Sequence, residues 1–204
     1  MEPASDSSGS RALDILQSPT VVAAIALIVV YISLGLIVGN IIDPLQPVSI
    51  LFFLMQCDTP IPVFPWTLLT TIFLHANVIH LVSNVLFLIF FGFILEEQVS
   101  KSRWITTFFI TGLAGSISFV SFDFLVFALQ PPNTPYLDCA VGASGAVYGV
   151  MGTAVGLKVV ILLIFLLGLN IFAGGGTPAH LGGLVAGLLL RRYWSLGGGG
   201  FRGI

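Results

Sequence analysis

Charged side chains are scarce in this sequence, which has seven basic and nine acidic residues among 204. They make up 8% of the chain, whereas soluble domains carry about 25%. So few charges cannot cover a soluble surface of this size, which argues against a soluble enzyme, a disordered chain and a basic nucleic-acid-binding protein. Cysteine is scarce too, and two residues form neither a disulfide framework nor a zinc site by themselves.

Apolar residues, by contrast, are abundant. They make up 56% of the chain, and the mean hydropathy is +1.06. A membrane-spanning helix needs roughly 20 apolar residues. The charge-free stretches therefore predict six spans: about 20–39, 69–95 and 104–122, one short span within 139–157, and two short helices within 159–190 that turn at 174–178.

The basic residues predict how these spans are oriented. With six spans, every Lys and Arg falls on one side of the membrane, and the opposite loops at about 40–68, 123–141 and 174–178 contain none. The positive-inside rule then places both termini in the cytoplasm. The predicted fold is an all-α six-helix membrane bundle at 19–193, with a polar cytoplasmic tail at 1–18 and a Gly-rich tail at 194–204. The outer loop at 40–66 is expected to lie partly in the membrane interface.

Polar residues within the predicted spans gather at one depth. Asn84 lies about 18 Å of helix from the cytoplasmic charge of Glu96, Ser144 about 21 Å from Lys158, and His180 about 16 Å from Arg191. His80, one turn from Asn84 on the same face, is close to this level. Since polar groups inside a membrane are costly, such a layer on three helices indicates a functional site.

Small residues on the predicted helices share faces with two of these polar groups. Gly145-x-x-x-Gly149 and Gly183-x-x-x-Gly187 are patterns that let membrane helices approach closely. If the two faces pack together, Ser144 and His180 come within hydrogen-bonding distance. A serine beside a histidine base is the arrangement of an activated nucleophile.

Three motifs in this order resemble the rhomboid family of intramembrane serine proteases over about residues 66–190. They are His75-x4-His80-x3-Asn84, then Gly142-x-Ser144-Gly145 continuing through Tyr148 to Gly152, and Ala179-His180-x2-Gly183-x3-Gly187. The resemblance implies a dyad without an acidic third member, in which Ser144 is the nucleophile and His180 its general base. It also implies that His80, Asn84 and the Ser144 backbone amide stabilise the oxyanion.

The resemblance assigns supporting roles and a substrate class as well. His75 would support the loop before the second span, and Tyr148 would pack against the His180 ring. The substrates would be single-span membrane proteins, cut near the outer end of the span, with no cofactor or metal. Partners are thus membrane helices and the lipid bilayer. The short loops suggest a prokaryotic plasma membrane.

Two departures from the family pattern stand out. Where many members have Trp-Arg before the second span, this chain has Trp66-Thr67, so the outer loop is expected to be anchored differently. Residues 159–190 give about 48 Å of helix, whereas two full crossings need about 60 Å. We therefore expect either two short helices or one that does not cross completely.

Other readings of the same residues remain open. Ser144 could cap its own helix, and His80 and Asn84 could be interhelical hydrogen-bonding residues. One zinc ion would not easily take both His75 and His80, which lie about 140° apart around a helix. For the whole chain, the alternative is a catalytically inactive rhomboid-like protein that binds membrane helices. Cys57 and Cys139 are expected in outer loops, and we predict no bridge between them.

Overall fold

The computed structural model describes residues 17–42, 44, 56–57, 64–129, 139–167 and 176–196. The helices are α2 (Pro19–Val38), α4 (Thr67–Thr70), α5 (Val78–Glu96), α6 (Lys101–Leu129), α7 (Ser144–Leu167) and α8 (Thr177–Tyr193), with a 3-10 turn η1 (Thr71–Phe73). Two short strands, β1 (Gln56–Cys57) and β2 (Cys139–Ala140), pair antiparallel.

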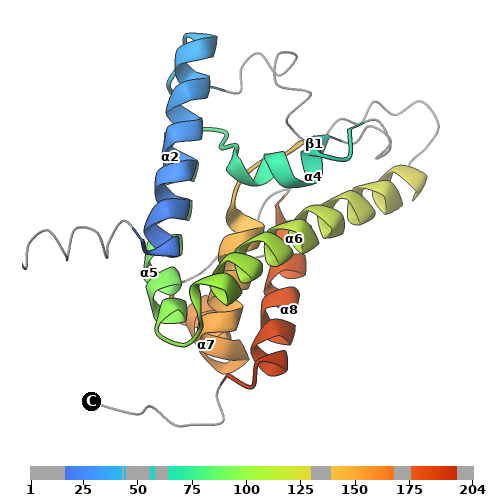
Figure 1. The fold of residues 1–204 in the computed structure, drawn as a ribbon. Helices are drawn as coiled ribbons and strands as arrows, with labels where there is room; N and C mark the ends of the chain where they lie inside the picture. The colour runs from blue at the N-terminus through green and yellow to red at the C-terminus, as the bar shows by residue number, and fades with distance from the viewer. Residues whose placement is uncertain are drawn as a thin grey trace, which may run out of the picture.

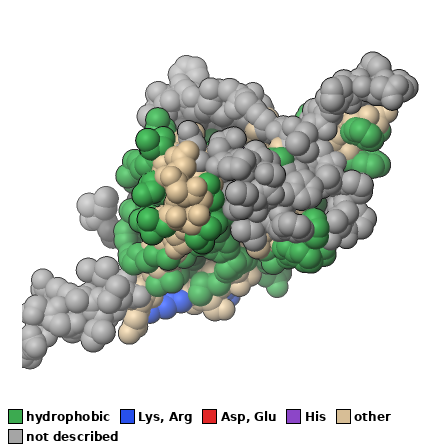
Figure 2. Space-filling model, turned by 90° about the horizontal axis from the view of Figure 1, so that it is seen from above, with side chains coloured by type: hydrophobic (Ala, Val, Ile, Leu, Met, Phe, Trp, Pro, Cys, Tyr) green, Lys and Arg blue, Asp and Glu red, His purple; other side chains and the backbone are tan. Residues whose placement is uncertain are grey.

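Four stretches of helix among the described residues are long and apolar enough to cross a membrane: α2, α5, α6 and residues 144–161 of α7. Large apolar side chains on these helices face outward, for example Ile37 of α2, Ile79 of α5 and Leu86 of α5, which are 77%, 74% and 62% exposed. In Figure 2, hydrophobic side chains cover most of the described surface in view. The chain is therefore a multi-pass helical membrane protein.

The helices form a bundle in which α7 and α8 stand side by side, and α6 crosses both obliquely (Figure 1). Helix α2 packs along α5. Hydrogen bonds tie several helix ends together at one end of the bundle. Glu96 Oε1, at the end of α5, accepts from Ser18 Oγ at 2.7 Å and from the Thr20 N–H at 2.8 Å, so it caps the start of α2.

Helix α5 begins later than the sequence predicts. The expected second span starts at about residue 69, but residues 67–73 form the separate short helices α4 and η1. The Asn77 side chain accepts from the His80 N–H at 2.9 Å, which satisfies a backbone donor of the first turn and fixes the helix start at Val78.

Helix α6 ends later than predicted. The expected third span ends at about residue 122 and is followed by a loop, but the helix continues to Leu129. No proline or glycine interrupts 117–129, and Asp123, the one charge in that stretch, is 5% exposed and lies on the inner face. The charge that marked the expected loop is therefore part of the helix.

Helix α7 runs through the boundary that we predicted between the fourth and fifth spans, with a kink at Gly156. Gly156 has φ 74° and ψ 172°, and helix resumes directly at Leu157. The Arg191 guanidinium of α8 donates to the carbonyls of Thr153 and Ala154 at 2.7 and 2.9 Å. The backbone angle at Gly156 requires glycine, and a β-carbon there would lie 2.9 Å from Arg191 Nε. The rest of the fifth span lies outside the described residues.

The prediction of no bridge between the cysteines is wrong. Cys139 is disulfide-bonded, and its Cα partner in the β1–β2 ladder is Cys57, the only other cysteine of the chain. The antiparallel pairing brings two loops together that are distant in sequence. Most of the outer loop at 40–66, predicted to lie partly in the membrane interface, and most of both tails lie outside the described residues.

Candidate active site

Glycines bring α6, α7 and α8 into backbone contact around the predicted site. A β-carbon on Gly183 would overlap the carbonyl oxygen of Gly145, and one on Gly187 would overlap that of Gly149. On the α6 side, a β-carbon on Gly115 would lie 2.9 Å from the Ala179 carbonyl oxygen. This is the close approach that the small-residue patterns predict.

Ser144 and His180 meet where these helices converge. Ser144 is the first residue of α7 and His180 lies in the first turn of α8, and Ser144 Oγ is 3.0 Å from His180 Nε2. The Tyr148 ring, one turn along α7, lies against His180 with a centroid distance of 4.6 Å. The first N–H groups of a helix have no intrahelical partner, so the Ser144 amide is a donor beside its own hydroxyl.

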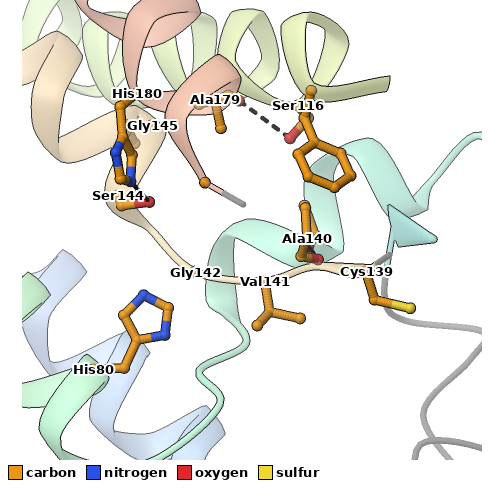
Figure 3. A pocket seen from close by; sticks show the side chains of 15 residues that line it. His80, Ser116, Cys139, Ala140, Val141, Gly142, Ser144, Gly145, Ala179 and His180 are labelled. Carbon is orange, nitrogen blue, oxygen red and sulfur yellow. Dashed lines mark hydrogen bonds between the residues drawn. The ribbon is translucent and has the colours of Figure 1, made fainter. Parts of the chain in front are cut away.

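His80 faces this pair across the backbone of Gly142 (Figure 3). Gly142 has φ 121°, and a β-carbon there would lie 2.7 Å from His80 Cε1 and 2.8 Å from Nε2. Both the backbone angle and the ring contact exclude other residues. Asn84 is buried below His80, and its Nδ2 donates to the His80 carbonyl at 3.0 Å. That bond uses one of its two N–H groups, so Asn84 also stabilises its own helix.

His75 lies outside the helices, between η1 and α5, and is 1% exposed. Its ring contacts His80 edge-on at a centroid distance of 5.2 Å. Burial, followed by the repulsion of a charged His80, lowers the pKa of His75 from 6.5 to about 3. The ring is therefore neutral at physiological pH and supports His80 by packing. Within the described residues, no third His, Cys, Asp or Glu joins these two rings.

Two cavities open onto the Ser144–His180 pair. One, of about 320 Å³, lies on the α6 side and includes Thr71, Gly142 and Ser116 in its wall. The other, of about 180 Å³, lies between α5 and α7 and is more apolar, with Phe87 and Met151 in its wall. Together they leave room beside the serine for both a peptide segment and water.

Thr71 and Ser116 are site residues that the sequence analysis missed. Thr71 lies four residues before the first motif, and its position in a run of threonines carries no signal of its own. Ser116 follows Gly112 and Gly115 on α6, and this stripe of small residues would have indicated that α6 approaches the site.

The fold and the site geometry define a class of protein. It is a multi-pass helical membrane protein with a serine–histidine pair where three helices meet. The chain belongs to the rhomboid family, because residues 64–196 match the Rhomboid domain. The resemblance noted from the three motifs is thereby confirmed.

Curated relatives match the same region. The chain is 34% identical over 142 residues to RHOMBOID-like protein 7 of Arabidopsis thaliana, covering 61% of this chain and 41% of the relative. It is 26% identical over 148 residues to Rhomboid-like protease 3 of Toxoplasma gondii, covering 64% and 52%. It is 29% identical over 137 residues to Rhomboid protease GluP of Bacillus subtilis, covering 60% and 24%.

The aligned part thus spans about half or less of each of these relatives. Two of these three are named as proteases. Further relatives of similar identity are RHOMBOID-like proteins of Arabidopsis thaliana, so the matches do not favour the predicted prokaryotic membrane.

Proposed function

We propose that the protein is an intramembrane serine endopeptidase in which Ser144 is the nucleophile and His180 the general base. The observation that carries the proposal is the 3.0 Å contact between Ser144 Oγ and His180 Nε2 at the start of two adjacent membrane helices. Family membership and two relatives named as proteases support it.

The first half of the reaction is acylation. His180 Nε2 takes the hydroxyl proton as Ser144 Oγ attacks the peptide carbonyl, and the same proton then passes to the leaving amine. The negative charge on the carbonyl oxygen is stabilised by the Ser144 amide, by His80 and by the free N–H of Asn84. Donors fixed in advance are most effective in a site of low dielectric constant.

The second half releases the product. A water molecule gives a proton to His180 while its oxygen attacks the ester carbonyl of the acyl-enzyme. The bond from the carbonyl carbon to Ser144 Oγ then breaks, His180 returns the proton to Oγ, and the new carboxyl end of the product leaves. The 320 Å³ cavity beside the pair, with polar Thr71 and Ser116 in its wall, provides room for that water. The Tyr148 ring packs against the His180 imidazole and keeps it in place beside Ser144.

We propose single-span membrane proteins as substrates, cut near the outer end of the span. The membrane arrangement behind this has six spans within 19–193 and both termini in the cytoplasm. In support, Lys101 is the first residue of α6, and Arg191 lies in the last turn of α8 and bonds the Thr153 carbonyl, away from Ser144 at the start of α7. Because Cys139 is disulfide-bonded, a membrane-impermeant thiol reagent should label the protein only from outside and only after reduction. Labelling only from the cytoplasmic side would contradict this orientation.

The decisive experiment reconstitutes the full chain in liposomes with a panel of single-span membrane substrates. Wild type should cleave at least one of them and react with a fluorophosphonate, and Ser144→Ala and His180→Ala should each abolish cleavage. Because the two residues act as a unit, the double variant should lose no more than either single one. Binding of substrates by wild type without cleavage or fluorophosphonate reaction would instead identify the inactive helix-binding alternative.

A further inference from the structure

A segment of four residues shortly before the nucleophile contacts a strand on one side and Thr71 on the other. This approach segment, residues 139–142, begins as strand β2, which pairs with β1 and carries the bonded Cys139. It then passes along the floor of the larger cavity to Ser144 (Figure 3). Its path sets where the Ser144 amide and hydroxyl lie, because only Ala143 intervenes.

Thr71 holds the other side of the approach segment with two polar groups. Its hydroxyl donates to the Ala140 carbonyl, and its own carbonyl accepts from the Gly142 N–H at 3.0 Å. The Ala140 carbonyl and the Gly142 N–H point the same way because alternate residues of an extended chain share a side. Thr71 is 3% exposed, so the bonds form where an unpaired carbonyl would be costly.

These two hydrogen bonds, called the Thr71 clamp below, hold the segment at Gly142, whose backbone has a positive φ. Gly142 has φ 121° and rests against the His80 ring. A shift of Gly142 would therefore displace both the Ser144 amide and the His80 side chain, two of the three proposed oxyanion donors. Thr71 reaches neither Ser144 nor His180 in any hydrogen bond of the described residues, so it acts through the backbone.

We propose that Thr71 is a positioning residue that fixes the approach segment, through its hydroxyl, in the geometry that the oxyanion requires. This inference rests on the proposed protease function. It explains why a hydroxyl, rather than an apolar side chain of the same shape, lies in a buried position at the start of η1.

The test compares Thr71→Val, which keeps the shape and the backbone bond to Gly142, with Thr71→Ser, which keeps the hydroxyl. Thr107→Val is the matched control, because Thr107 is also buried but its hydroxyl donates to the Arg103 backbone carbonyl within α6 at 2.8 Å. Each full-length variant is measured for kcat and KM in proteoliposomes, for its fluorophosphonate reaction rate, and for hydrogen exchange of the peptide containing Gly142.

Thr71→Val should lower kcat by about 10- to 100-fold with little change in KM, because misplacement of the site by a fraction of an ångström acts on the transition state. It should also speed exchange at Gly142 and slow the fluorophosphonate reaction. Thr71→Ser should restore most of the turnover, and Thr107→Val should keep it. If Thr71→Val does not fold, Thr71→Ala, which adds no bulk, takes its place with the same expectation.

Wild-type kcat in the hydroxyl-free variant, or unchanged Gly142 exchange, would overturn the proposal. So would an equal loss in Thr71→Ser, which would show that packing of the methyl group matters instead. If wild type neither cleaves any substrate nor reacts with the fluorophosphonate, the protease function itself fails. Faster Gly142 exchange in Thr71→Val would then show only that Thr71 stabilises the approach segment. The proposed role in positioning the site for catalysis would be wrong as well.

Discussion

The contact between Gly183 and Gly145 makes a sharp prediction about how the site depends on helix spacing. A β-carbon on Gly183 would lie on the Gly145 carbonyl oxygen, closer than any real carbon–oxygen contact. That oxygen belongs to the helix backbone and cannot turn away, so in Gly183→Ala α8 must move from α7 by roughly 1 Å or more. Ser144 and His180, now 3.0 Å apart, would then lie beyond hydrogen-bonding distance.

We therefore expect Gly183→Ala to lower kcat by about 100-fold or more, since displacement of about 1 Å has that effect on positioned groups. The assay is cleavage in proteoliposomes, normalised to folded protein by thermal unfolding. Val185→Ala, on the exposed side of the same turn, should keep wild-type turnover. Gly183→Ala with wild-type kcat would refute the argument that the glycine faces set the Ser144–His180 distance.

Three further changes test other parts of the structure. Asn84→Ala should cut turnover by up to about 10²- to 10³-fold, the usual effect of one oxyanion donor, while Ser144 still reacts with a fluorophosphonate; loss only in proportion to lost thermal stability would make Asn84 a packing residue. Glu96→Gln should lower the free energy of unfolding by about 1 kcal/mol, measured by thermal or denaturant unfolding, because a charged acceptor at the start of α2 becomes neutral. His75 has a pKa of about 3 when folded and 6.5 when unfolded, so acidification favours the unfolded state by up to about 1.4 kcal/mol per pH unit below 6.5; the drop in melting temperature from pH 7 to 4.5 should be smaller in His75→Gln.

The sequence predicted the residues of the candidate site more accurately than the ends of the helices. The contact between Ser144 and His180 could be predicted because a residue's depth and its face follow from its position along a regular helix. The glycine faces indicated which helices pack closely. The membrane character followed from composition alone. These are periodic or summed properties, which do not depend on the details of any one loop.

The features that the sequence missed arise from contacts between distant segments. The charge of Asp123 suggested a loop, but its position on the inner face of α6 lets the helix continue to Leu129. The start of α5 depends on the Asn77 cap, which has little weight in an apolar window. The pairing of β1 with β2, which involves two residues on each side, leaves no detectable pattern, so neither the disulfide of Cys139 nor the Thr71 clamp could be foreseen.

The kink at Gly156 also constrains how the protein is made. The Thr153 and Ala154 carbonyls that end the first part of α7 accept from Arg191, a residue synthesised only when α8 is. Until then those carbonyls lack this partner, and the helices on either side of Gly156 have no loop between them that would let one settle without the other. The kink at Gly156 should thus become fixed late, when the nascent chain delivers the arginine.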